Sequence, residues 1–224
     1  MHNVVSVSFP RSGHHLLERC LRGIFPGQVA YCDYYRHCRT SPCIDGRTNL
    51  QKCHDFNLRL TCAPGWIYVV QYRHPLEAIV SWYEAELRHR HKYRPGETRL
   101  RKAVKLAFLK DSELYWQFFL AKYVRFWRRF VEKWAMTPPD GALLLSYRDF
   151  VQEPVESLTR IVEVVASEAP PERAAIEAVV REQKIGERRS IRDFRYYDAR
   201  RFARIEAGVL PQLTAVGLSR IIED

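Results

Sequence analysis

Residues 8–13, which read SFPRSG, have the residue types of a loop that holds an anion. They separate an apolar run from a stretch with helical spacing. Backbone N–H groups at a helix start and the positive end of the helix dipole attract negative charge. Gly13 lets the backbone approach an anion closely, and Arg11 offers a planar fork that suits phosphate or sulfate oxygens. By itself the string is equally typical of an ordinary strand–helix turn.

Arg73 and Ser81 form a second candidate anion site. Arg73 ends an apolar run, and Ser81 follows within the second turn of an expected helix. At the carboxyl edge of a parallel sheet both side chains could reach one phosphate. Taken alone, a surface charge at a strand end and a polar residue on a helix face explain the pair more simply.

Lys52 and His54 are candidates for acid–base chemistry. Because side chains in a strand alternate between its faces, these two residues are expected on the same face. A nearby positive charge favours the neutral form of a histidine, which is the form that a general base requires. A surface histidine in a loop is the simpler alternative.

The elements expected to position these residues alternate between strand and helix. Residues 25–65 are largely irregular, and the remaining strands and helices follow from hydrophobic periodicity. Strands are predicted at 3–8, 49–52, 66–72 and 142–146, and helices at 13–24, 75–83, 111–134, 155–166, 170–181 and 205–216. This alternation indicates one α/β domain, residues 1–224, with a mostly parallel central sheet flanked by helices.

The composition indicates a folded protein with an anionic partner. The chain has 224 residues, of which 46% are hydrophobic, and its net charge is +10. Nucleic acid, an anionic membrane surface and a polyphosphorylated small molecule all fit that charge. We find no secretory signal and no apolar run of the ~20 residues that a membrane-spanning helix needs, so a cytoplasmic location is expected, with a trimmed anchor left open.

Six cysteines lie in one stretch near the N-terminus. They form no C-x-x-C pair, and their spacings match no common zinc template. Free thiols are the favoured interpretation, and a local disulfide such as Cys38–Cys43 or a metal site stays open. The six are Cys20, Cys32, Cys38, Cys43, Cys53 and Cys62.

In their order and approximate spacing, these sites resemble those of sulfotransferases that use 3′-phosphoadenosine 5′-phosphosulfate (PAPS). Residues 8–17 (SFPRSGHHLL) look like the family's 5′-phosphosulfate loop, and residues 52–54 like its Lys-x-His segment. Residues 72–83 (YRHPLEAIVSWY) look like the 3′-phosphate site. Residues 145–155 (LSYRDFVQEPV) are similar to the family's Tyr-x-Asp-Leu-x-x-x-Pro stretch, and residues 184–189 (KIGERR) resemble its late basic loop.

The resemblance spans nearly the whole chain and implies a single sulfotransferase domain of three α/β/α layers, related to the P-loop NTPases. It implies that Arg11 neutralises the bridging oxygen, Lys52 helps to hold the transferring group, and His54 takes the acceptor's proton. No metal, nucleic acid or membrane span is implied; PAPS is the co-substrate and the desulfated nucleotide PAP is the product. The expected donor-binding residues are Arg11, Ser12, Gly13, His14, His15, Leu16, Arg73, Ser81, Arg188 and Arg189.

His14 and His15 depart from the family pattern, because they stand where a hydroxyl residue usually contacts phosphate. An imidazole can still donate a hydrogen bond, so donor binding with a stronger pH dependence is expected. The acceptor, a hydroxyl or amine of a carbohydrate, lipid-linked or small molecule, is left open.

Two other functions fit parts of the sequence. A small-molecule kinase of related fold would need a phosphate loop with Lys-Ser/Thr, which residues 8–13 lack. A non-catalytic nucleic-acid-binding protein would explain the charge, but the sequence has no RNA- or DNA-reading motif.

Overall fold

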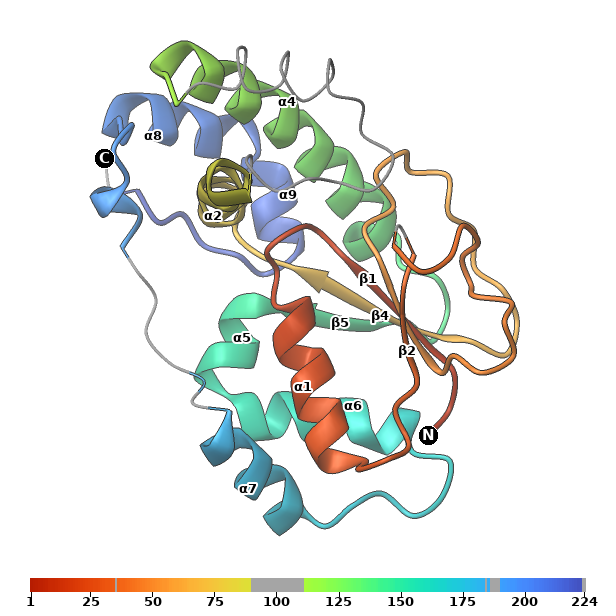
Figure 1. Ribbon diagram of the computed structural model, residues 1–224. Helices are drawn as coiled ribbons and strands as arrows, with labels where there is room; N and C mark the ends of the chain where they lie inside the picture. The colour runs from red at the N-terminus through yellow and green to blue at the C-terminus, as the bar shows by residue number, and fades with distance from the viewer. Residues whose placement is uncertain (35, 90–110, 184, 186–189, 223–224) are drawn as a thin grey trace. The chain divides into compact units, whose positions relative to one another are not determined.

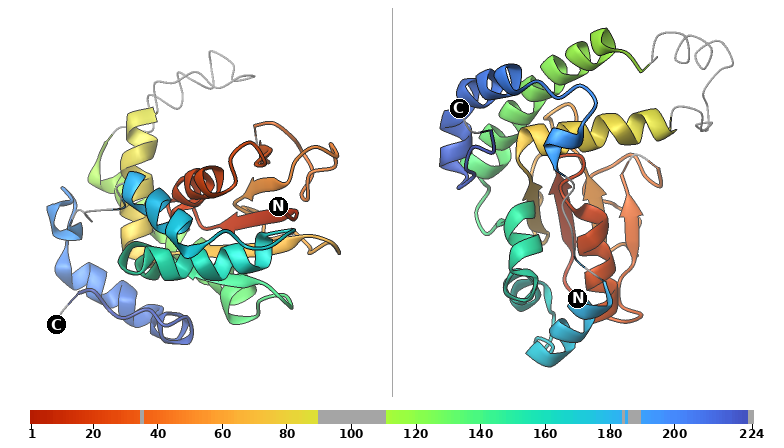
Figure 2. Two further views of the ribbon diagram at one scale, coloured as in Figure 1. Left: turned by 90° about the horizontal axis from the view of Figure 1, so that it is seen from below. Right: turned by 90° about the vertical axis from the view of Figure 1, so that its left-hand side faces the viewer.

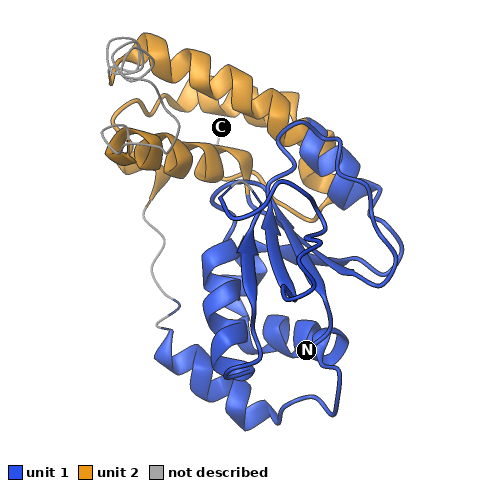
Figure 3. Cartoon of the chain, turned by 45° about the vertical axis from the view of Figure 1, so that its right-hand side comes forward, with its two compact units in different colours: residues 1–73, 129–188 blue, residues 74–128, 189–224 orange. Residues whose placement is uncertain are grey.

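The computed structural model describes residues 1–34, 36–89, 111–183, 185 and 190–222. The chain divides into two compact units (Figure 3). Unit 1 consists of Met1–Arg73 and Arg129–Arg188, and unit 2 of His74–Arg128 and Arg189–Asp224. The single domain over residues 1–224 stays a prediction.

Unit 1 is built on a parallel sheet that has five strands in the described residues (Figure 1). The strands, in the order β2-β3-β1-β4-β5, are β2 (Tyr31–Asp33), β3 (Leu50–Cys53), β1 (Val4–Ser8), β4 (Ile67–Tyr72) and β5 (Leu143–Ser146). All four pairings are parallel, and Val4 of the central strand lies opposite both Leu50 and Ile67. The carboxyl ends of β3, β1 and β4 therefore meet at one edge of the sheet.

Helices cover both faces of this sheet (Figures 1 and 2). On one face α1 (His14–Ile24), α6 (Pro154–Val165) and α7 (Arg173–Glu182) share a buried core with the strands. On the other face lies the π-helical turn η1 (Glu132–Met136), whose Trp134 ring stacks on Tyr68 of β4 at 6.1 Å between centroids. The predicted α/β fold with a mostly parallel sheet is confirmed.

Unit 2 is helical and has an aromatic core. Its described elements are α2 (Pro75–His89), α4 (Glu113–Val131, up to Arg128 in this unit), η2 (Ile191–Asp193), α8 (Ala199–Gly208) and α9 (Leu210–Ala215). The rings of Tyr83, Trp116 and Phe194 lie within 6.0 Å of one another. His74, which follows directly on unit 1, is buried against Glu206 of α8, with Nε2 and Oε1 3.1 Å apart.

Four strands and the first helices lie where the sequence predicts them, and four details differ. Strand β2 falls in a region expected to be irregular. Helix α5 (Tyr147–Gln152) follows β5 without a loop, because Ser146 ends the strand and caps the helix by accepting from the Asp149 N–H. Helix α7 begins at Arg173 rather than at the prolines. The helix predicted at 205–216 is two helices that meet at Val209.

Among the described helices, none combines the length and the apolar character that crossing a membrane requires.

Candidate functional site

The loop between β1 and α1 has two residues with left-handed backbone. Arg11 has φ 70° and Gly13 has φ 93°, and Ser12 N–H donates back to Phe9 O at 3.1 Å. Gly13 O accepts from Leu16 N–H at 2.9 Å and from Leu17 N–H at 3.0 Å. The N–H groups of His14 and His15 therefore belong to the first turn, where a helix has no internal acceptor for them. The loop has the backbone donors of an anion site, and Arg11 is exposed beside them.

Two features favour glycine at position 13: its left-handed backbone and its close packing against an aromatic ring. A Cβ added at this position would lie 2.8 Å from Cδ2 of Tyr147 and 3.7 Å from Cδ1 of Phe150. Tyr147, the tyrosine of the 145–155 motif, also has the Arg73 guanidinium over its ring at 4.4 Å from the centroid. Tyr147 thus joins three of the motifs that the sequence separates.

His14 lies beneath this loop, buried in a chain of hydrogen bonds. Ser6 Oγ donates to Gln71 Oε1 at 2.7 Å, so its oxygen accepts from His14 Nδ1 at 2.8 Å. His14 Nε2 then accepts from the Tyr31 hydroxyl at 3.3 Å. Gln71 Nε2 continues the chain to Ser12 O at 3.5 Å. Burial, and then the charge of Lys52, hold the pKa of His14 well below its usual value.

This placement argues against the expectation that the His14 imidazole replaces a phosphate-binding hydroxyl. Both of its ring nitrogens have protein partners, and its lowered pKa favours the neutral ring. Its physical role is to tie β1, β2 and the loop together. For an anion His14 offers its backbone N–H, and the pH dependence expected from its ring is not supported.

His54 follows β3 and lies beside the end of β1. Its Nδ1 is 2.7 Å from the backbone oxygen of Ser8 and 3.2 Å from Ser8 Oγ. A carbonyl can only accept, so Nδ1 carries the proton and Nε2 keeps a lone pair. Burial, followed by the positive charge of Lys52, lowers the pKa of His54 to about 4. This direction agrees with the neutral form expected from the sequence, and the role of His54 stays a prediction.

Lys52 is held by a carboxylate that the sequence did not single out. Its Nζ lies 3.1 Å from Asp33 Oδ2, and both side chains are largely buried. Asp33 ends β2, the strand that was not predicted, so no spacing along the chain could have revealed this pair. The arrangement holds the ammonium group near the strand ends that also present His54.

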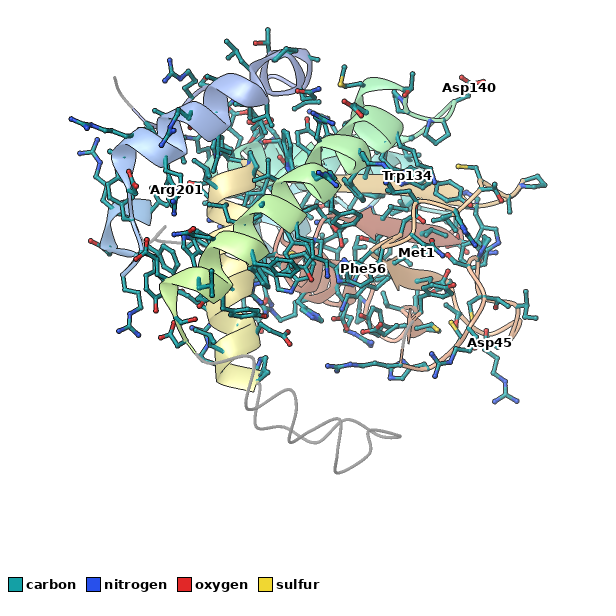
Figure 4. The ribbon with its side chains drawn as sticks, turned by 90° about the horizontal axis from the view of Figure 1, so that it is seen from above. Met1, Asp45, Phe56, Trp134, Asp140 and Arg201 are labelled. Atoms are coloured by element: carbon teal, nitrogen blue, oxygen red, sulfur yellow. The ribbon has the colours of Figure 1, made fainter. Side chains whose placement is uncertain are left out.

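A second carboxylate, Asp55, fixes the backbone just after His54. Asp55 is buried, and its Oδ2 accepts from Lys133 Nζ at 2.7 Å and from the Trp134 indole N–H at 2.9 Å. Its Oδ1 accepts from Leu60 N–H at 2.9 Å. Figure 4 labels Trp134 together with Phe56, which follows Asp55 in the chain. The segment that carries His54 is thereby anchored to η1.

The remaining predicted residues lie in different environments. Ser12 is buried, and its hydroxyl has no hydrogen-bond partner within the described ranges. His15 is largely exposed, with Nδ1 3.5 Å from Glu18 Oε2, and its pKa is lowered by partial desolvation and then by the charge of Lys52. The Leu16 N–H is used within the first turn. Ser81 lies on α2 in unit 2, half-buried.

Arg188 and Arg189 lie outside the described residues, as do most of residues 184–189. Their assignment to donor binding stays a prediction. Within unit 1, the structure does bring together the β1–α1 loop, Lys52, His54 and Arg73 at the carboxyl ends of adjacent strands.

Comparison with known proteins adds one independent line of evidence. No family model matches the sequence, and no curated protein matches it. A solved structure that does match is mouse sulfotransferase SULT7A1 complexed with PAP, with a TM-score of 0.63 and 14% sequence identity. The match covers 95% of this chain and 84% of the mouse chain. With its mostly parallel sheet between helical layers, the chain has the α/β fold of the sulfotransferases.

Proposed function

We propose that this chain is a sulfotransferase that transfers a sulfuryl group from PAPS to a hydroxyl or amine. The observation that carries the proposal is the contact of His54 Nδ1 with Ser8 O, which keeps Nε2 as the ring's acceptor at the sheet edge where a helix-start loop presents Arg11. A base and an anion loop are the two parts that such a transfer needs. The fold shared with a mouse sulfotransferase that was solved with PAP supports the same reaction class.

The first turn of α1 fits the anionic end of such a donor. The N–H groups of His14 and His15, the positive end of the helix and the exposed Arg11 are all sources of positive potential. The hydroxyl of Ser12, which has no partner among the residues that the structure describes, is a further hydrogen-bonding group of the same loop. Arg11 would bind the oxygen on which negative charge grows as the bond to sulfur breaks, and Lys52 would hold the sulfuryl oxygens.

His54 would remove the proton of the acceptor. The acceptor oxygen or nitrogen forms the new bond to sulfur, the bond between sulfur and the donor's 5′-phosphate oxygen breaks, and the proton passes to Nε2. A histidine with a pKa of about 4 is a weak base in the free protein. Negative charge held beside it stabilises the imidazolium, so donor binding would raise this pKa toward the working pH.

Arg73 would hold a phosphate of the nucleotide from the other side of the loop. Its guanidinium is kept in place by the Tyr147 ring, and that ring also touches Gly13. The pairing of Arg73 with Ser81 on one phosphate stays a prediction. The acceptor class, whether carbohydrate, lipid-linked or small molecule, remains part of the proposal.

Calorimetric titration with PAP tests this function. Micromolar or tighter binding is expected for the wild-type chain, with Arg73→Ala weakening it at least tenfold, a loss of about 1.4 kcal/mol. Arg173→Ala is the matched control, because it removes an exposed arginine of unit 1 that pairs with Glu156 and Glu177.

Two results would overturn the proposal. One is the absence of PAP binding at modest salt by a folded protein. The other is preferential binding of ATP with magnesium, which would favour the kinase alternative.

A further inference from the structure

Three cysteine sulfurs converge in the segment that joins β2 to β3. The Sγ atoms of Cys32, Cys38 and Cys43 all lie within 4.8 Å of one another, and those of Cys32 and Cys38 are 3.0 Å apart. Cys32 and Cys43 are buried, and Cys38 is partly exposed. The other three cysteines of the chain do not belong to this group. Three thiols gathered at one point, in a protein whose cysteines are all free, need a physical explanation.

The spacing of the sulfurs suits a metal ion. A tetrahedral zinc ion with Zn–S bonds of about 2.3 Å places its sulfur ligands about 3.8 Å apart. The Cys32–Cys38 distance is shorter than that value, and the bound of 4.8 Å on all three pairs is longer than it. A disulfide would use two of the sulfurs and leave the third as a thiol beside it. A soft metal ion uses all three.

Cys38 Sγ has a buried amide donor beside it, together with two carbonyl oxygens, Thr40 O at 3.4 Å and Tyr34 O at 3.9 Å, to which its thiol can donate. Gln51 Nε2 donates to Cys38 Sγ at 3.2 Å, and the same amide group is fixed by Ser41 Oγ and by Thr40 O. N–H groups that point at sulfur stabilise a metal-bound thiolate and orient it. Gln51 is fully buried in β3, so this donor is rigid.

The geometry points to a three-thiolate zinc site formed by Cys32, Cys38 and Cys43. On binding, each thiol loses its proton to solvent and three sulfur–zinc bonds form, so one Zn²⁺ is exchanged for three H⁺. The fourth position belongs to a water on the partly exposed side of Cys38. Binding is expected to be stronger at higher pH, because the protons of the three thiols must leave.

The site would stabilise the framework next to the proposed base. Cys32 precedes Asp33, which holds Lys52, and Gln51 precedes Lys52 itself. Asp45, labelled in Figure 4, caps the turn after Cys43 by accepting from Thr48 N–H at 2.9 Å. A metal ion would therefore tie this whole connection to β2 and β3, without taking part in the transfer reaction.

The test is the metal content of the full-length protein, purified with reductant and without chelator. About one zinc ion per chain is expected by mass spectrometry, with at least a fivefold loss in Cys38→Ser and Cys43→Ser. Cys62→Ser is the control, because Cys62 is exposed and outside the cluster, and it should keep the metal. Cobalt(II) added to metal-free protein should give the absorption bands of tetrahedral sulfur coordination.

A chelator should lower the melting temperature of the wild type and leave that of Cys38→Ser unchanged. Because each protein is compared with itself, this result is informative even if the variant is less stable. Metal-free wild type that takes up neither zinc nor cobalt would overturn it. So would two thiols fewer than the six of the sequence in protein that is both purified and denatured without reductant, since that result identifies a disulfide. PAP binding, measured on the same samples, reports separately on the proposed function.

Discussion

The start of α1 and the end of β3 each place a histidine beside β1, and the two rings relate differently to the protein around them. Both have a lowered pKa, and in both the first cause is burial and the second is Lys52. His14, however, has protein partners on both ring nitrogens, from Ser6 and Tyr31. His54 is bound through Nδ1 to Ser8 O, which leaves the Nε2 lone pair for the acceptor's proton in the proposed reaction.

The difference shows that a lowered pKa does not by itself identify a base. Burial favours the neutral form of a histidine wherever it occurs, in a structural network as well as in an active site. The partner of each nitrogen separates the two cases. We therefore expect His14 to matter for stability and His54 for turnover, and four measurements test that division.

The largest effect is expected from His54→Ala. Loss of the general base should lower turnover by about 10²–10⁴-fold, whereas PAP affinity should change little because the anion loop is intact. His14→Ala should instead lower the free energy of unfolding and reduce turnover much less. The two variants are compared by their rates of PAPS-dependent sulfation over a panel of acceptors and by their dissociation constants for PAP. Equal losses of turnover in the two variants would remove the distinction.

Asp55→Ala should be the most destabilising change near His54. It leaves Lys133 Nζ and the Trp134 indole N–H without their buried acceptor. The expected loss in the free energy of unfolding is about 3 kcal/mol, at the low end for a broken buried ion pair because Lys133 is partly exposed. Urea unfolding measures it, with the exposed Asp140→Ala as control. A loss below about 1 kcal/mol would mean that the pair behaves as a surface ion pair.

Gly13→Ala tests how closely the Tyr147 ring packs against the loop between β1 and α1. Gly27 has φ 73° and open space around its Cα, whereas Gly13 has φ 93° and the Tyr147 ring at 2.8 Å from an added Cβ. Gly27→Ala should cost about 1–2 kcal/mol of stability from its backbone alone. Gly13→Ala should cost about 1–3 kcal/mol more, from overpacking against Tyr147. Similar losses in both variants would show that the ring moves aside.

The smallest effect is expected in the pH dependence of the free energy of unfolding. Both histidines have a folded-state pKa below 6.5, so the unfolded chain binds more protons between pH 6.5 and about pH 4. Stability should therefore fall as the pH falls through that window, and His54→Ala should flatten the curve. In NMR titrations PAP should raise the midpoint of His54 and leave His14 titrating as before. If PAP instead raised the titration midpoint of His14, the phosphate contact would belong to the His14 ring.

The sequence predicts the fold where its signals are local. Pro75 opens α2 as expected, and the β-branched run before Phe9 forms β1. Strand β2 was missed because three residues are too short to show an alternation, and they are held only by pairing with β3. Helix α5 was missed because Ser146 serves the strand and the helix at once, which leaves no turn residues to mark the boundary.

The candidate site was predicted as a set of residues and not as an arrangement. Spacing could place Lys52 and His54 near one strand end, but Asp33, which holds Lys52, and Tyr31, one partner of His14, lie on β2, which is distant in sequence from both. The same limit applies to the cysteines. Residues 32, 38 and 43 match no metal template along the chain, and their sulfurs meet only because the connection from β2 to β3 folds back on itself.

The central place of β1 has a consequence for how the protein is made. This strand is synthesised before both of its partners, which come only with Leu50–Cys53 and Ile67–Tyr72. A nascent chain that has not reached β4 carries the β1 residues VVSVS, which the folded protein buries, with unpaired backbone on at least one side. Such non-local pairing slows folding and exposes a strand that can join the wrong neighbour. Expression at lower temperature, or with a chaperone that shields short apolar segments, should therefore raise the yield of active protein.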